Sequence, residues 1–492
     1  MVGADETALD LLRTPEAGGR VVRGGLIRGV GFGISTALGL ATAVLLLHYL
    51  SLDDFGRYAT VTAVLGIVAG ITDAGLTAVG SREISIARTA TERAIILRHL
   101  LVLRIVGASV GVLAGVAFTV VAGYSNVVIA GTALGGLGVI LISVQSMLTV
   151  PIWVELRIVS LTTLEVLRNL LTLAGVAVLV LAGTGLLAFF GVQVVVGIVL
   201  IPTTFVLARV GMRLASGIRR EMLVRLVRET LPLAVAFAMS VIYFRVLVVL
   251  VSLLSSEKQT GLFGTSFRIF ELLLGLPALI LSVALPLLSV AGDEDDERLR
   301  NGLQSMTEAS LLIAALLVVG IGILAKPGIL LVGGNQYVRA APVLRIQALA
   351  LIPVFLGQVW QLGLIAGRAQ RAMAVANGLA LVLVIALGLT FVPRGGATAA
   401  AWVAVGAETA LALFLRIALG RMRPGGAPSL WFAWKAALAM ALAAGTGYLL
   451  RDSLLVAACV AVLVFGVVAL VTKAVPADAY HAFGLTRDRE DE

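Results

Sequence analysis

The chain has 492 residues, of which 60% are hydrophobic and only 13% charged, and its mean hydropathy is +1.06. A soluble core of this size cannot bury so much apolar surface, so the composition excludes an ordinary soluble enzyme and indicates a membrane protein. The net charge of +9 does not indicate nucleic-acid binding, because the basic residues flank apolar segments and form no basic face with interleaved aromatic residues.

The N-terminal residues 1–28 mix acidic and basic side chains before any long apolar run. They predict a cytoplasmic tail and not a cleaved signal peptide. The single cysteine, Cys459, lies in a late apolar segment, and the three histidines are scattered. This pattern argues against a disulfide framework and against a metal site built on cysteines, and we expect no metal or organic cofactor.

About fourteen apolar segments follow, each long enough to cross a bilayer as a helix. Arginines gather before the first segment, after the second and after the sixth, that is, on one side of the membrane. The positive-inside rule makes this side cytoplasmic, and the even number of segments then places both termini there. We therefore predict a multi-pass protein of the bacterial cytoplasmic membrane with spans at 29–50, 58–80, 100–122, 127–151, 161–182, 185–208, 231–254, 262–290, 308–332, 341–365, 372–392, 397–418, 432–450 and 454–473.

A basic linker at 209–230 alternates apolar and basic positions, as an amphipathic helix lying on the membrane surface does. Across this linker HYLSLDDFGRYATVTA (48–63) weakly repeats as SLLSSEKQTGLFGTSF (252–267). An offset of six spans gives both copies the same orientation, which predicts two lobes related by an axis along the membrane normal.

The expected fold is an all-α polytopic membrane protein with two six-helix lobes in a pseudo-two-fold parallel repeat and two further C-terminal helices. The predicted division is a tail at 1–28, an N-lobe at 29–208, the linker at 209–230, a C-lobe at 231–418, two helices within 419–473 and a cytoplasmic tail at 474–492.

Four segments resemble a known family of membrane proteins. They are LSLDDFGRYATVTAVLGIVAGITDAGLTAVGSREIS (50–85), YFRVLVVLVSLLSSEKQTGLFGTSFRIFELLLGLPALILSVALPLLS (243–289), LLVGGNQYVRAAPVLRIQALALI (330–352) and GRAQRAMAVANGLALVLVIALGLTFVPRGGATAAAWVAVGAETAL (367–411). Taken in order, they are similar to segments of the Wzx-type polysaccharide-lipid flippases. That family belongs to the superfamily that also contains the MATE multidrug exporters and the lipid II flippase.

The resemblance implies a MATE-like fold and the export of an undecaprenyl-diphosphate-linked oligosaccharide by alternating access, for the synthesis of cell-surface polysaccharide such as O-antigen or exopolysaccharide. It implies a lipid-linked glycan as substrate, membrane lipid as surroundings, and a polysaccharide polymerase or ligase as partner, with no nucleic acid involved. It also implies a transporter and not an enzyme.

Charged residues inside the spans are costly in lipid, so they should face a cavity or pair with one another. Arg245, near the middle of the seventh span, is a candidate for attracting the diphosphate of the lipid carrier, and the alternative is a structural ion pair. Arg268 and Glu271 stand three residues apart in the eighth span, within reach of each other. They form either a neutral pair or part of a cationic cavity, to which Arg28 at the mouth of the first span is added as a weaker candidate.

Glu271 and two further acids, Asp73 and Glu408, are candidates for proton or sodium coupling or for charge pairing. Asp73 could instead pair with an arginine or provide polarity at a helix end, and Glu408 could instead make a structural hydrogen bond. The glutamines of the spans offer hydrogen bonds to sugar hydroxyls, although helix packing uses the same groups. They are Gln145, Gln347, Gln358 and Gln361.

Two rival functions remain open. A drug or ion exporter on the same fold would have a small closed cavity with carboxylates. A membrane glycosyltransferase or polymerase would use external carboxylates such as Asp53 and Asp54, but this pair also suits a helix N-terminus. The sequence contains no Walker-type phosphate loop, which argues against ATP hydrolysis.

Overall fold

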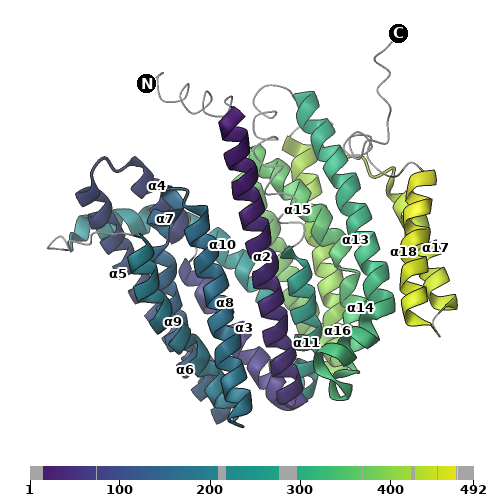
Figure 1. Cartoon of the computed structure of the whole chain (residues 1–492), viewed down its shortest axis with the longest axis horizontal. Coiled ribbons are helices and arrows are strands. Elements are labelled where there is room, and N and C mark those ends of the chain that lie inside the picture. Colours follow the sequence, from purple (N-terminus) through teal and green to yellow (C-terminus); the bar gives the residue numbers. More distant parts are fainter. Residues whose placement is uncertain are drawn as a thin grey trace. The chain divides into compact units, whose positions relative to one another are not determined.

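The computed structural model describes residues 15–73, 75–208, 218–275, 296–367, 369–422, 427–450, 453–472 and 474. Within these ranges all regular structure is helical (Figure 1). The elements are α2 (Pro15–Tyr49), α3 (Leu52–Asp73), α4 (Leu76–Ile86), α5 (Ala90–Val121), α6 (Asn126–Leu148), α7 (Val150–Val154), α8 (Ile158–Leu181), α9 (Leu186–Ala208), α10 (Arg220–Leu254), α11 (Glu257–Leu273), α13 (Asp296–Gly333), the 3-10 turn η1 (Asn335–Tyr337), α14 (Ala340–Ala348), α15 (Leu351–Ala366), α16 (Gln370–Met422), α17 (Ala433–Leu449) and α18 (Leu454–Val471).

The predicted spans fall on one or two of these helices each, except that residues 276–290 of the eighth span lie outside the described residues. Eleven helical segments of the described chain are long and apolar enough to cross a membrane. Two more predicted spans fall on α11 and α17, each of 17 residues. The 53-residue α16 contains both the eleventh and the twelfth predicted span. A backbone break at Gly396 (φ 53°, ψ −134°), after Pro393, separates the two. The all-α polytopic fold expected from the sequence is confirmed.

The chain divides into two compact units. Unit 1 comprises Met1–Tyr49 and Val61–Val241, and unit 2 comprises Leu50–Thr60 and Ile242–Glu492. The first turns of α3 therefore group with unit 2, whereas the rest of that helix groups with unit 1. The lobe and linker boundaries expected from the sequence differ from these limits, and they stay predictions.

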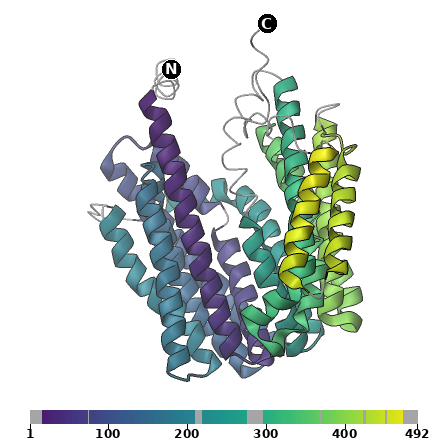
Figure 2. The same cartoon turned by 45° about the vertical axis from the view of Figure 1, so that its right-hand side comes forward.

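In unit 1, α2 packs along α8, and α6 packs against both α5 and α9 (Figures 1 and 2). The predicted second span is broken: α3 ends at Asp73, and Gly75 adopts φ 81° before α4 begins. Beyond α4, the side chains of α4, α5, α7 and α10 enclose a small apolar core in which Leu226 is fully buried.

Of the predicted surface linker, residues 209–217 lie outside the described residues. The part that is described belongs to α10, which runs without interruption from Arg220 to Leu254. Burial of Leu226 and an ion pair between Arg225 and Glu83 of α4 hold this first part of α10 against unit 1. It is thus continuous with the seventh span and does not form a separate helix.

In unit 2, the main apolar core is formed by side chains of α13, α15, α16, α17 and α18. The C-terminal helices α17 and α18 lie side by side and pack on α13 (Figure 2). The break in α16 is held from α11, because the Gln259 side-chain oxygen accepts a hydrogen bond from the Ala397 amide at 2.9 Å.

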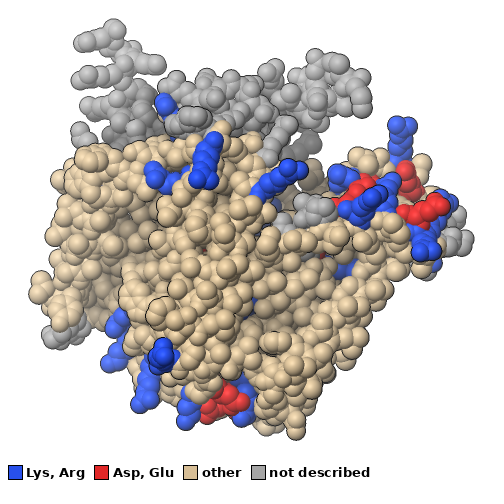
Figure 3. Space-filling model, turned by 180° about the vertical axis from the view of Figure 1, so that it is seen from behind, with Lys and Arg blue, Asp and Glu red and all other residues tan. Residues whose placement is uncertain are grey.

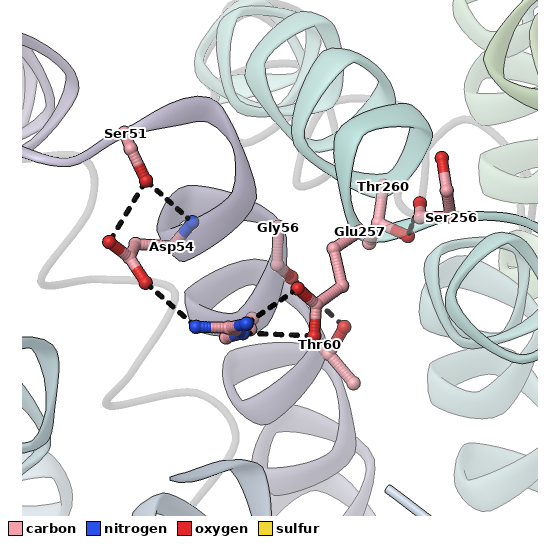
Figure 4. A network of polar contacts seen from close by, with 8 residues as sticks. Ser51, Asp54, Gly56, Thr60, Ser256, Glu257 and Thr260 are labelled. Carbon is pink, nitrogen blue, oxygen red and sulfur yellow. Dashed lines mark hydrogen bonds and ion pairs between the residues drawn. The ribbon is translucent and has the colours of Figure 1, made fainter. Parts of the chain in front are cut away.

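The starts of α3 and α11, which carry the weak repeat, cross each other inside unit 2 (Figure 4). Each helix has a serine at its start whose hydroxyl accepts a backbone amide three residues on, Ser51 from Asp54 and Ser256 from Gln259. The helices cross at two glycines: a Cβ on Gly56 would collide with the Glu257 carbonyl, and a Cβ on Gly261 with the Leu52 carbonyl. Only glycine permits so close a backbone approach at both places.

An ion-pair network ties this crossing together. The Arg57 guanidinium donates to the Glu257 carboxylate at 2.9 Å through two nitrogens and contacts Asp54 at 3.1 Å. On the face seen in Figure 3, charged side chains gather toward the two ends of the helices, and uncharged side chains cover the helices between them. This distribution is typical of a protein that crosses a membrane.

Candidate functional site

Three charged side chains of the seventh and eighth spans meet inside unit 2. Arg245 of α10 donates to one oxygen of Glu271 at 2.6 Å. Arg268 of α11 donates to the other oxygen at 3.0 Å. We call Arg245, Arg268 and Glu271 the cationic cluster. Because two guanidiniums share a single carboxylate, the cluster carries a surplus positive charge.

Aromatic rings flank the cluster. The Arg245 guanidinium carbon lies 5.6 Å from the ring centroid of Phe244 and 5.9 Å from that of Phe267. Such contacts stabilise a cation by about 0.5–2 kcal/mol, more where water is excluded. Arg245 stands near the middle of the apolar segment Phe237–Leu254, so the rings and Glu271 together offset its cost in a membrane.

The cluster remains partly accessible. The side chains of Arg245 and Glu271 are 26% and 21% exposed, and that of Arg268 is 43% exposed. A guanidinium has five N–H donors, and Glu271 accepts only some of those that the two arginines present. The free donors and the surplus charge make the cluster suited to binding an anion with several oxygens, such as a phosphate.

Another polar contact of unit 2 joins α10 and α16. The carboxyl of Glu408 interacts with Tyr243, which is 8% exposed. The Tyr243 hydroxyl oxygen is fully buried and has no hydrogen bond of standard geometry among the described residues. We find no ion pair between Glu408 and a basic side chain within that part of the chain. A carboxyl in such a place is suited to carrying a proton.

The other predicted charges lie in unit 1. Asp73 contacts Arg104 of α5 at 2.7 Å and accepts a hydrogen bond from Thr77 at 2.7 Å. Arg104 is buried and also donates to the Thr72 carbonyl at 2.6 Å, so the pair fixes the break between α3 and α4. Arg28 of α2 lies over the Trp153 ring at 5.3 Å. The roles of Asp73 in coupling and of Arg28 in a substrate cavity remain predictions.

The predicted sugar-binding glutamines are distributed over both units. In unit 1, the buried Gln145 donates to Thr204 at 3.0 Å and so joins α6 to α9. In unit 2, Gln347 is 1% exposed and its side-chain oxygen has no hydrogen-bond partner among the described residues. Gln358 and Gln361 are half-buried on α15, and their three-residue spacing places them on one helix face.

Sequence reasoning overlooked three polar contacts that the structure reveals. Tyr243 interacts with Glu408, and the Arg245 guanidinium lies over the Phe244 ring. Glu83, which is 4% exposed, forms ion pairs with both Arg82 and Arg225. Only the spacing of Phe263, Phe267 and Phe270 offered a signal, since it places three rings on one face of α11. Within the described residues, no group of three or more His, Cys, Asp or Glu side chains could hold a metal ion.

The sequence matches one protein family. The sequence model of a family described as "Polysaccharide biosynthesis protein" matches residues 45–342. This range covers the crossing of α3 and α11, the cationic cluster and most of unit 1. No curated protein matches the sequence at a significant level.

Solved structures share the fold over nearly the whole chain. A structure described as "Lipid II flippase MurJ, inward closed conformation" superposes with a TM-score of 0.75 at 14% identity, covering 93% of this chain and 99% of that one. An inward-facing MATE-family multidrug resistance transporter superposes with a TM-score of 0.68 at 15% identity, over 81% and 98% of the two chains. A transporter of the same MOP superfamily from Pyrococcus furiosus gives 0.57 at 15% identity, over 82% and 95%. At these identities the likeness establishes the fold.

Proposed function

The chain belongs to the family of polysaccharide biosynthesis proteins, and on that premise we propose that it is a flippase for a lipid-linked oligosaccharide. The substrate is an undecaprenyl-diphosphate-linked repeat unit of a surface polysaccharide. The protein moves it across the bacterial cytoplasmic membrane by alternating access, with both termini in the cytoplasm. A polysaccharide polymerase or ligase receives the product.

The cationic cluster carries this proposal. A diphosphate presents several negatively charged oxygens that must leave water to cross a bilayer. Arg245 and Arg268 stand in the spans with more positive charge than Glu271 neutralises, so they supply charge-assisted hydrogen bonds to that group. Gln358 and Gln361, on one face of α15, are suited to the sugar hydroxyls.

The fold supports a transporter and not an enzyme. A protein whose structure superposes on this chain is by its description a flippase of lipid II. In the rival enzyme, Asp53 and Asp54 would act as catalytic carboxylates, but Asp54 is engaged by Ser51 and Arg57 at the start of α3 (Figure 4). Of the three candidate coupling acids, Glu408 is the best proton carrier, because Asp73 is engaged by Arg104 and Glu271 by two arginines.

The test is translocation in proteoliposomes. Fluorescent undecaprenyl-diphosphate oligosaccharide is placed in both leaflets, and the fraction accessible to an external quencher or glycosidase is followed over time. We expect leaflet exchange that requires the protein and that inorganic diphosphate inhibits. Export of a small cationic dye without exchange of the lipid would favour a drug exporter, and a new glycosidic linkage would favour the enzyme.

A further inference from the structure

A groove runs along the surface of unit 1 between α2 and α8. It has a volume of about 600 Å³, within the range of roughly 300–1,000 Å³ that is usual for small-molecule sites. Its walls are apolar except for two threonines, and one of these, Thr163, already donates its hydroxyl to the Val159 carbonyl at 2.8 Å. Gly31 lies so close to Thr162 that a Cβ there would collide with the threonine methyl. The groove therefore offers its occupant almost only hydrocarbon contacts.

The length of the groove matches one leaflet of a bilayer. Among the described side chains, which on α2 begin at Ile27, the groove is lined on α2 from Ile27 to Ile34 and on α8 from Val159 to Leu170. At 1.5 Å per residue these stretches measure about 10 Å and about 16 Å. One leaflet contributes about 15 Å of hydrocarbon to a membrane. Since α2 and α8 belong to the first and fifth spans, they run in the same direction, and Ile27 and Val159 lie toward the same end.

A cation stands at that end. Arg28 follows Ile27 on α2, is exposed, and lies over the ring of Trp153 at 5.3 Å. We find no carboxylate paired with it among the described residues. Trp153 is itself 44% exposed, and Leu156 nearby in the chain is 77% exposed with a left-handed backbone (φ 52°). Exposed tryptophan, leucine and arginine side chains together are typical of the boundary between lipid headgroups and acyl chains.

We propose that this groove is a binding site for one anionic phospholipid of the adjacent leaflet. An acyl chain fills the groove between α2 and α8, and the lipid phosphate accepts hydrogen bonds from Arg28. The described walls of the groove span about one leaflet, a length that fits an acyl chain and is shorter than the polyprenyl chain of the transported lipid. Arg28, for which the described residues provide no carboxylate partner, selects a headgroup with net negative charge. This inference does not rest on the proposed flippase function.

The test is native mass spectrometry of the full-length protein, titrated with phosphatidylglycerol and with phosphatidylcholine. We expect tighter binding of phosphatidylglycerol. Arg28→Ala should weaken that binding about tenfold, the effect of losing a hydrogen bond to a charged group, and should weaken phosphatidylcholine binding less, because the choline cation of that headgroup already offsets the phosphate charge. Val30→Trp, at a groove residue that is 57% exposed, should fill the groove and weaken the binding of both lipids.

Two matched controls come from unit 1. Arg220→Ala removes another exposed arginine, and Val106→Trp enlarges an apolar residue of α5 that is 56% exposed. Both should bind the lipids as the wild type does. Equal binding of the two lipids by the wild type, or wild-type affinity in either Arg28→Ala or Val30→Trp, would overturn the proposal. Loss of binding in the controls as large as in the test variants would do the same. The mass spectrum reads lipid binding alone, so failure of the flippase proposal would appear separately, in the translocation assay.

Discussion

Replacing Arg245 by alanine tests whether translocation of the substrate depends on the surplus charge of the cationic cluster. In the wild type, Glu271 accepts from Arg245 at 2.6 Å and from Arg268 at 3.0 Å. The variant leaves one guanidinium opposite one carboxylate, so the surplus charge disappears. A hydrogen bond between charged groups contributes about 1.5–3 kcal/mol, which corresponds to a translocation rate that is about tenfold to a hundredfold lower.

A second substitution separates charge from shape. In the double variant Arg245→Ala with Glu271→Gln, the carboxylate is neutralised and Arg268 again carries a surplus positive charge. We expect this double variant to recover part of the lost rate, although one arginine cannot reproduce the donors of two. Arg245→Lys should lie between wild type and Arg245→Ala, because an ammonium keeps the charge and loses the fork of donors.

The assay is leaflet exchange of fluorescent undecaprenyl-diphosphate oligosaccharide in proteoliposomes, at equal protein content and with thermal unfolding measured for each variant. Arg220→Ala, which removes an exposed arginine outside the cluster, should exchange lipid as the wild type does. Full activity of a folded Arg245→Ala variant would refute the reasoning. A double variant as inactive as the single one would show that the surplus charge is not what matters.

Three further predictions concern stability. Gly56→Ala should lower the unfolding temperature, because the added Cβ would collide with the Glu257 carbonyl. The control Gly29→Ala, whose Cβ would have no neighbour, should be neutral or stabilising by up to about 1 kcal/mol. Equal effects of the two variants would contradict the close crossing of α3 and α11. Asp73→Asn should lower the free energy of unfolding by about 1–2 kcal/mol, because it leaves Arg104 unpaired; the loss is smaller than for a fully buried pair because Asp73 is 46% exposed. Adding Arg104→Met should restore part of the lost stability. Denaturant unfolding would measure both effects. The Tyr337 hydroxyl donates to the Leu50 carbonyl at 2.9 Å, and burial, followed by the Asp54 carboxylate, raises the pKa of this hydroxyl. The protonated hydroxyl therefore stabilises the folded state below the unfolded-state pKa of about 10, and this stabilisation is lost as the pH rises above that value. The unfolding of Tyr337→Phe should depend less on alkaline pH, and an unchanged dependence would argue against this role.

Hydropathy was sufficient to locate the spans, because each crossing requires a long apolar run that no soluble segment needs. It could not locate the breaks inside them. Gly75 adopts a positive φ between α3 and α4, inside a single predicted span. Hydropathy averaged over a whole span hardly changes with one residue, so it cannot reveal such a break. An amphipathic pattern likewise cannot specify a tertiary contact such as the burial of Leu226, in the described part of the predicted linker, against α4, α5 and α7.

The charged residues show the same division between local and tertiary information. The spacing of Arg268 and Glu271 places them on one helix face, and they do pair. That Arg245 reaches the same carboxylate from another helix, and that Tyr243 accompanies Glu408, depend on how α10 packs against α11 and α16. A single sequence, read by itself, carries no record of such pairings.

The stoichiometry of the cluster argues for binding over mere support. A charge inside a span costs several kcal/mol unless it is paired, and one arginine beside one carboxylate would meet that need. Here Glu271 is already paired with Arg268, three residues away on the same helix, and Arg245 contacts it as a second arginine. Aromatic rings stabilise this additional cation. Since removing Arg245 would leave a balanced pair, stability of unit 2 alone does not explain its presence. The proposed function supplies a reason for it: an anionic substrate group that enters the spans would neutralise the surplus charge while it is bound.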